Sequence, residues 1–209
     1  MSKHSRVSKH IASILIVCEG ETEVQYFTAL RNKLKIGTMH INLQTSNQKT
    51  EPEQVVNKAK EFICTYREIY CVFDKDMHAT FDDAEKEVER IKKDKKIDIK
   101  AIVSVPCFEY WILLHYQYTN QNFYSNQTPC KNAEKLLKKD IPNYSKPYKN
   151  FKSVVDKFEI AIKHAEQSKK AKGDNDEYSY TDVVEVVKRM RDIAISQGTW
   201  QPCIESKIG

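Results

Sequence analysis

The chain has 209 residues, of which 40% are hydrophobic and 30% are charged, and its mean hydropathy is −0.63. No apolar run approaches the roughly 18 residues that a membrane span needs, so we expect a cytoplasmic protein that makes no contact with a membrane. The net charge is +5, and the residues from 131 onwards carry 16 basic and 12 acidic side chains, against 18 and 17 in the rest. This imbalance favours a polyanionic partner, although a solvated, lysine-rich helical surface explains it equally well.

The first half of the chain alternates between strand-like and helix-like patterns. Short apolar or alternating runs predict strands, and the stretches between them carry apolar side chains at helical spacing. The predicted strands cover residues 13–18, 39–45, 69–73 and 99–105, and the predicted helices cover 22–36, 52–63 and 80–93. Thr22 is the predicted N-cap of the first helix and Gly37 its stop. Strands that alternate with helices predict parallel pairing with right-handed crossovers.

The second half of the chain, after Pro106, is predicted to be helical. The predicted helices cover residues 108–118, 131–138, 151–167 and 181–195. The predicted fold class is therefore α/β, with a Rossmann-like parallel sheet flanked by helices and a helical C-terminal part. We expect a basic N-terminal lead-in at residues 1–10, an α/β core at 11–118, and a helical C-terminal extension at 119–209 that packs on the core.

Acidic side chains follow two of the predicted strands. Glu19, with Glu21 and Glu23, comes directly after the first strand, and Asp74 and Asp76 follow the third. Residues i and i+2 of an extended segment point the same way, so both aspartates can face one cation. Ligands of open parallel sheets bind beyond the carboxyl ends of the strands. If the first and third strands are neighbours, the two acidic groups meet in one pocket.

Several carboxylates in one pocket need a counter-cation, because like charges repel. Oxygen ligands with no cysteine partner favour Mg²⁺ or Mn²⁺ over zinc, and the six cysteines include no C-x-x-C pair. A simpler explanation remains open for Glu21 and Glu23, since acids in the first turn of a helix oppose the helix dipole.

A third acid, Glu109, lies in the first turn of the strongly apolar helix predicted after Pro106. Burying an acid among apolar neighbours costs free energy unless a partner offsets the charge. Glu109 is a candidate metal ligand, a partner for Lys75, a partner for a substrate-binding base, or a surface acid at a helix N-terminus. His115 is expected to be structural, because it does not share a helix face with Glu109.

The stretch YSKPYKNFK, residues 144–152, alternates lysines with aromatic residues. Lys146, Lys149 and Lys152 are candidates for binding nucleic acid, with the aromatic rings placed as in a single-strand contact. A plain structural turn is an equally good interpretation of this stretch.

The acidic motifs resemble those of the Toprim domain, which places a glutamate after its first core strand and a D-x-D after its third. More closely, the chain resembles the RloB-like proteins. The stretches that carry this resemblance are ILIVCEGETEVQYF, VFDKDMH and VPCFEYWILLHY and, more loosely, YSYTDVVEVVKRM. The resemblance implies a Toprim-like fold, Mg²⁺-dependent phosphodiester chemistry and a role in bacterial restriction or abortive infection of phage. It also implies an ABC-type, RloA-like ATPase as a partner, and it leaves a homodimer open.

The resemblance also implies roles for individual residues. Glu19 matches the Toprim glutamate, as metal ligand or general base, and Asp74 and Asp76 match the D-x-D metal ligands. Glu23 matches the second acid of the E-G-x-T-E motif and would complete a second metal site. The chain departs from the Toprim pattern at His78, where other Toprim enzymes often carry a further acid. His78 could be a metal ligand, a proton shuttle, a phosphate contact or a structural residue.

The function expected from these residues is cleavage of DNA or RNA, with tRNA among the candidate substrates, by a Mg²⁺- or Mn²⁺-dependent nuclease. One alternative is a non-catalytic sensor or regulatory subunit of an ATPase-containing defence complex, and another is a metal-dependent phosphatase. The chain contains no G-x-x-x-x-G-K-[ST] and no G-x-G-x-x-G motif, so any ATP chemistry must come from a partner.

Overall fold

The computed structural model describes residues 14–38, 40–46, 51–75, 80–124, 128–172 and 178–201. In this part of the chain the strands form one five-stranded sheet of order β2-β1-β3-β4-β5, in which only β5 runs antiparallel to its neighbour. The strands are β1 (Ile14–Cys18), β2 (Ile41–Thr45), β3 (Glu68–Asp74), β4 (Asp98–Val105) and β5 (Tyr180–Thr181). The α/β class with a parallel sheet that the sequence predicts is therefore confirmed.

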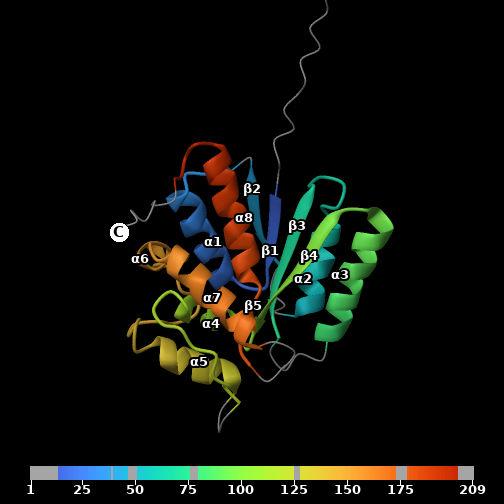
Figure 1. Cartoon of the computed structure of the whole chain (residues 1–209). Coiled ribbons are helices and arrows are strands. Elements are labelled where there is room, and N and C mark those ends of the chain that lie inside the picture. Colours follow the sequence, from blue (N-terminus) through green and yellow to red (C-terminus); the bar gives the residue numbers. More distant parts are fainter. Residues whose placement is uncertain are drawn as a thin grey trace, which may run out of the picture.

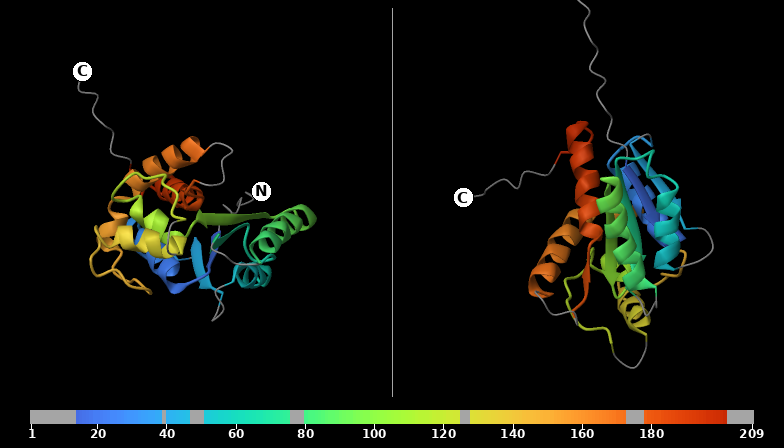
Figure 2. Two further views of the ribbon diagram at one scale, coloured as in Figure 1. Left: turned by 90° about the horizontal axis from the view of Figure 1, so that it is seen from below. Right: turned by 90° about the vertical axis from the view of Figure 1, so that its right-hand side faces the viewer.

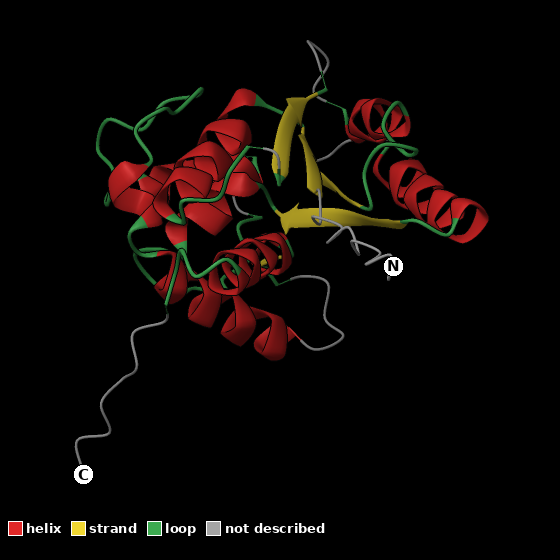
Figure 3. Ribbon diagram, turned by 90° about the horizontal axis from the view of Figure 1, so that it is seen from above, coloured by secondary structure: helices red, strands yellow, loops and turns green. Residues whose placement is uncertain are grey.

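Helices cover both faces of the sheet (Figure 1). One face packs against α2 (Pro52–Lys60) and α3 (Phe81–Lys95), and the other against α1 (Glu21–Lys33), α4 (Phe108–Leu113), α7 (Phe158–Lys172) and α8 (Val183–Ser196). Views from below and above the sheet show this unequal division (Figures 2 and 3). The short α5 (Pro129–Leu137) and α6 (Lys152–Val155) complete the larger side. None of the described helices combines the length and apolar character that crossing a membrane requires.

The apolar run of β1 is unbroken because both of its faces are covered. Leu15 and Val17 pack toward α2 and α3, whereas Ile14, Ile16 and Cys18 pack toward α1, α4 and α8. All five side chains are buried. A strand that buries every side chain has no polar face, so it lacks the alternation of a half-exposed strand.

Some predicted boundaries are wrong. Helix α1 begins at Glu21 rather than after Thr22, since Gly20 is the extended N-cap and the Thr22 hydroxyl accepts a hydrogen bond from the backbone N–H of Tyr148. The predicted helix 108–118 ends at Leu113, and the predicted helix 151–167 is divided into α6 and α7. Strand β5 was not predicted, because two residues carry no periodic pattern.

His115 has a structural role, as expected. Its Nε2 lies 3.0 Å from the Tyr26 hydroxyl and its Nδ1 lies 3.0 Å from the backbone oxygen of Trp111, and the side chain is 1% exposed. Burial lowers the pKa of His115 from its ordinary value to about 3, because the charged imidazolium loses its hydration. The imidazole therefore stays neutral wherever the protein is folded.

We expect this buried imidazole to destabilise the fold in acid. Below about pH 6.5 the unfolded chain takes up a proton at His115 that the folded protein refuses, so stability falls from there toward pH 3, by on the order of 4 kcal/mol. Urea unfolding at several pH values should show that His115→Gln is less stable than the wild type at neutral pH. Its free energy of unfolding should fall less steeply than that of the wild type as the pH is lowered. His40→Gln serves as the control, and an equal acid slope in His115→Gln and the wild type would contradict the assignment.

Candidate metal centre at the carboxyl ends of the strands

The carboxyl ends of β1 and β3 lie toward the bottom of Figure 1, and acidic residues stand at the end of each strand. Strands β1 and β3 are paired in parallel, so Glu19 leaves the sheet beside the end of β3. The Asp74 backbone N–H donates to Glu19 Oε2 at 3.1 Å, and the Glu19 N–H donates to the Val72 oxygen at 3.0 Å. The backbone of the two strands therefore fixes the Glu19 carboxylate next to Asp74.

Glu23 reaches the same place from the first turn of α1. Its side chain is 7% exposed, and a Cβ atom at Gly20 would lie 3.0 Å from Glu23 Oε2. The glycine of the E-G-x-T-E motif therefore leaves room for the Glu23 carboxylate. Burial, with the charges of Glu109 and Glu19, raises the pKa of Glu23 to about 7, although a backbone hydrogen bond and Lys146 oppose the shift.

Asp74 and Glu109 are also buried, 8% and 1% exposed. Burial raises the pKa of Asp74 well above its ordinary value, and the charges of Glu19, Glu23 and Glu109 add to this shift. Ligand atoms of Asp74, Glu109 and Cys107 all lie within 4.8 Å of one another. The start of α4 therefore brings the Cys107 thiol to the same place as these carboxylates, a neighbour that the sequence did not indicate.

One oxygen of Glu109 is held and the other is left without a partner. The Tyr144 hydroxyl donates to Glu109 Oε1 at 2.6 Å, and the ammonium of Lys146 lies 2.9 Å from the same oxygen. Glu109 Oε2 is buried and has no hydrogen-bond partner among the described residues. Burying a carboxylate oxygen without a hydrogen-bond donor costs free energy, and a cation bound at this atom would offset that cost.

Lys146 places a positive charge among these acids. Burial lowers the pKa of Lys146, but the carboxylates of Glu109 and Asp74 outweigh this and hold it above its ordinary value. The Lys146 side chain is still 50% exposed, so its ammonium contacts the buried acid from the solvent side. It lines the mouth of a cavity of about 270 Å³, together with Glu19, Gly20, Glu21, Thr22, Glu23, Asp74 and Pro147. This cavity is called the acid pocket below.

The remaining predicted site residues lie elsewhere or outside the described residues. Asp76 and His78 both fall in the second group. Lys75 turns away from the acid pocket, with its ammonium 5.3 Å from the centre of the Phe81 ring, so it is not the partner of Glu109. Lys149 and Lys152 are exposed and line a separate cavity beside α1.

The aromatic residues of the stretch 144–152 are not arranged for stacking on bases. Tyr144 is 2% and Phe151 is 1% exposed, and Tyr148 packs between their rings with centroid distances of 5.0 and 4.9 Å. The single-strand contact predicted from the alternation of aromatic and basic residues is therefore wrong for the aromatic rings.

Sequence reasoning also missed the roles of Tyr144, Lys146 and Cys107 in the acid pocket. The only signal was the Y-x-K spacing of the first two residues, which by itself points to no particular chemistry. Cys107 directly precedes α4, but an isolated cysteine in an apolar context is usually a packing residue.

The donor set of the acid pocket fits a divalent cation. Carboxylate oxygens are the ligands that Mg²⁺ and Mn²⁺ prefer, and the buried Glu109 Oε2 is available to such an ion. The four carboxylates of Glu19, Glu23, Asp74 and Glu109 face a single ammonium among the described residues that line or adjoin the pocket. This excess of negative charge is what a bound metal ion would neutralise.

Comparison with known proteins gives one match. The family model described as RloB-like protein matches residues 14–190, which include every element from β1 to most of α8. No curated protein and no solved structure matched the chain. The match covers more than half of the sequence and includes Glu19, Glu23, Asp74 and Glu109, and the chain therefore belongs to the RloB-like protein family.

Proposed function

We propose that the protein is a metal-dependent nuclease that hydrolyses phosphodiester bonds of nucleic acid and acts in bacterial anti-phage defence. The observation that carries the proposal is the placement of Asp74 between two other acids. Its backbone N–H donates to Glu19 Oε2, and its carboxylate lies within 4.8 Å of a ligand atom of Glu109, whose Oε2 is buried and without a partner among the described residues. The defence role rests on the resemblance to the RloB-like proteins alone.

Glu19, Asp74 and Glu109 would hold the metal, and Glu23 lies close enough to influence it electrostatically. Asp76, which is outside the described residues, is a further candidate ligand. A divalent ion supplies Lewis acidity to the phosphate and lowers the pKa of an attacking water.

The side chains of the protein position the reacting groups. The Asp74 N–H orients the Glu19 carboxylate, which serves as a ligand or accepts a proton from the water. Tyr144 and Lys146 hold Glu109 in one orientation, and the exposed side of the Lys146 ammonium is open to a phosphate oxygen. A fixed positive charge at this point would stabilise charge that develops on the phosphate.

The test is calorimetric titration of Mg²⁺ and Mn²⁺ into the wild type and into Asp74→Asn/Asp76→Asn, with plasmid DNA and total tRNA incubated with each protein in parallel. We expect the wild type to bind metal and cleave one of these nucleic acids. The double variant should fold normally, bind no metal, and cleave at least about 10³-fold more slowly.

One outcome would count against the assignment of the site and another against the nuclease. Undiminished cleavage by the double variant would remove the acid pocket from the chemistry. Metal binding by the wild type without cleavage of either nucleic acid would favour the alternative, a non-catalytic sensor or regulatory subunit that works with an ATPase partner.

A further inference from the structure

A second cavity, of about 470 Å³, lies between α1 and the segment that leads into α6. We call it the α1 groove; it is lined from α1 by Gln25, Asn32 and Lys33, and from the other side by Lys149, Asn150 and Lys152. Buried aromatic and aliphatic side chains, Phe151 and Val155, also contribute to its lining. The lining thus combines three ammonium groups and several amides with apolar side chains and one carboxylate, that of Asp156.

The α1 groove and the acid pocket are separate cavities, but neighbouring residues of the same two segments line them. Glu21 and Glu23 of α1 line or border the acid pocket, and Gln25 of the same helix lines the groove. Across from α1, Lys146 lines the acid pocket and Lys149 lines the groove. These two lysines are three residues apart, so their Cα atoms lie within about 11 Å of each other.

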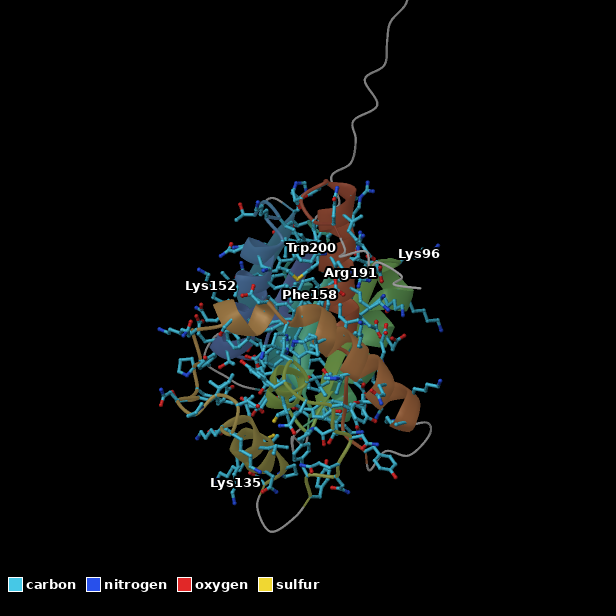
Figure 4. The ribbon with its side chains drawn as sticks, turned by 60° about the vertical axis from the view of Figure 1, so that its left-hand side comes forward. Lys96, Lys135, Lys152, Phe158, Arg191 and Trp200 are labelled. Carbon is cyan, nitrogen blue, oxygen red and sulfur yellow. The ribbon has the colours of Figure 1, made fainter. Side chains whose placement is uncertain are left out.

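The positive charge of the α1 groove is largely uncompensated. Lys149 and Lys152 are exposed, and neither forms an ion pair with a described residue. Lys152 lies at the periphery of the molecule (Figure 4). Lys33 pairs with Asp156, an ion pair that joins the two walls at the far end of the groove.

The buried aromatic rings determine how this surface can recognise a polyanion. Tyr144 and Phe151 belong to the hydrophobic core, and the half-buried Tyr148 packs against both of their rings, so the rings of this segment are engaged with one another. What the segment offers are ammonium and amide donors, which contact phosphate oxygens without reading sequence.

We infer that the α1 groove is the binding track for the sugar–phosphate backbone of the nucleic acid, with Lys149 and Lys152 contacting phosphates that flank the one in the acid pocket. This inference rests on the proposed nuclease function and adds to it that the substrate is held by its phosphates, independently of its base sequence. It also assigns different roles to the three lysines. Lys146 contacts the reacting phosphate, whereas Lys149 and Lys152 contact the phosphates beside it.

The test compares Lys149→Gln/Lys152→Gln with a control of equal charge change, Lys93→Gln/Lys95→Gln. Lys93 and Lys95 are exposed on α3, which covers the opposite face of the sheet. Binding is measured by fluorescence anisotropy with labelled oligo(dT), oligo(dA), oligo(rU) and a duplex DNA over a series of salt concentrations. All anisotropy measurements contain EDTA, so that no cleavage occurs, and Mg²⁺ binding is measured separately by calorimetry without EDTA.

We expect the groove variant to bind single strands about tenfold more weakly than the control variant. The slope of log K against log salt should become shallower by about 1.4, from two lost phosphate contacts at about 0.7 each. Oligo(dT) and oligo(dA) should be affected equally, and calorimetric Mg²⁺ binding should be unchanged.

Equal affinity and equal salt slope in the two double variants would overturn the role of the α1 groove as a binding track. If the wild type still cleaved nucleic acid, the nuclease proposal would stand. A wild type that neither binds nor cleaves any of these nucleic acids would overturn both proposals. Loss of Mg²⁺ binding in the groove variant would also contradict the inference, because the lysines would then act on the acid pocket rather than on the substrate.

Discussion

Replacing Asp74 by asparagine is expected to make the metal-free protein more stable and, at the same time, to remove the stabilisation that Mg²⁺ gives the wild type. Asp74 is 8% exposed and faces the charges of Glu19, Glu23 and Glu109, so its ionised form is repelled and poorly solvated. Asparagine keeps the shape and loses the charge. We expect a gain of about 1–2 kcal/mol, which corresponds to roughly 3–8 °C in the melting temperature.

The raised pKa of Asp74 also determines how the effect of Asp74→Asn on stability changes with pH. Because the folded-state pKa of Asp74 is raised, its contribution to stability is favourable in acid and is lost as the pH rises through that pKa. The gain from Asp74→Asn should therefore be larger near pH 8 than near pH 5. Mg²⁺ at about one hundred times its dissociation constant should stabilise the wild type by about 2.7 kcal/mol, and this effect should vanish in the variant.

Melting curves with and without Mg²⁺ provide the measurement. Asp83→Asn, an exposed acid on α3, is the matched control and should change neither quantity. A metal-free Asp74→Asn protein that melts below the wild type would show that Asp74 stabilises the fold by a contact of its own, and would argue against a pocket of mutually repelling carboxylates.

Replacing Lys146 by methionine is expected to tighten metal binding and yet to slow cleavage. The ammonium of Lys146 and a metal ion would both be attracted to Glu109, so removal of the lysine leaves the acid pocket more negative and the carboxylate more available. We expect Mg²⁺ to bind roughly three- to tenfold more tightly. Cleavage should slow by about 10²-fold or more, because the phosphate loses a positively charged contact.

Without metal, the Lys146→Met protein should be destabilised by only about 1 kcal/mol, since the lysine side chain is 50% exposed and its ion pair is partly screened. Calorimetry, single-turnover cleavage and melting curves measure the three effects. Lys149→Met, which changes the α1 groove and not the acid pocket, is the control for metal affinity. Weaker Mg²⁺ binding in Lys146→Met would contradict the idea that the lysine and the metal share Glu109.

The sequence predicted the sheet and two of its acids because those features are local. The apolar runs of β1 and β3 and the helix between them indicate parallel strands, and Glu19 and Asp74 stand at the ends of those runs. An acid at the end of a buried strand can be placed without knowledge of the rest of the fold. This is why the neighbouring positions of Glu19 and Asp74 could be anticipated.

The contribution of residues 144–147 could not be predicted, because no periodic pattern says where this loop lies. Its position depends on tertiary contacts, among them the hydrogen bond from the Tyr148 N–H to the Thr22 hydroxyl at 3.3 Å. The mixture of lysine and tyrosine suggested an exposed strip, whereas packing buried Tyr144 and turned Lys146 toward Glu109. Tertiary structure outweighed composition here.

The way in which Glu109 is held has a consequence for the order in which the site is made during synthesis. Glu19, Asp74 and Glu109 are synthesised well before Tyr144 and Lys146. The latter two side chains are the ones that contact Glu109 Oε1. A nascent chain that ends before residue 144 has the acids but neither of these partners for Glu109. If the protein is the nuclease proposed above, its site would stay unassembled on the ribosome until most of its length had been translated, which would limit the time during which an incomplete enzyme could act on the nucleic acids of its own cell.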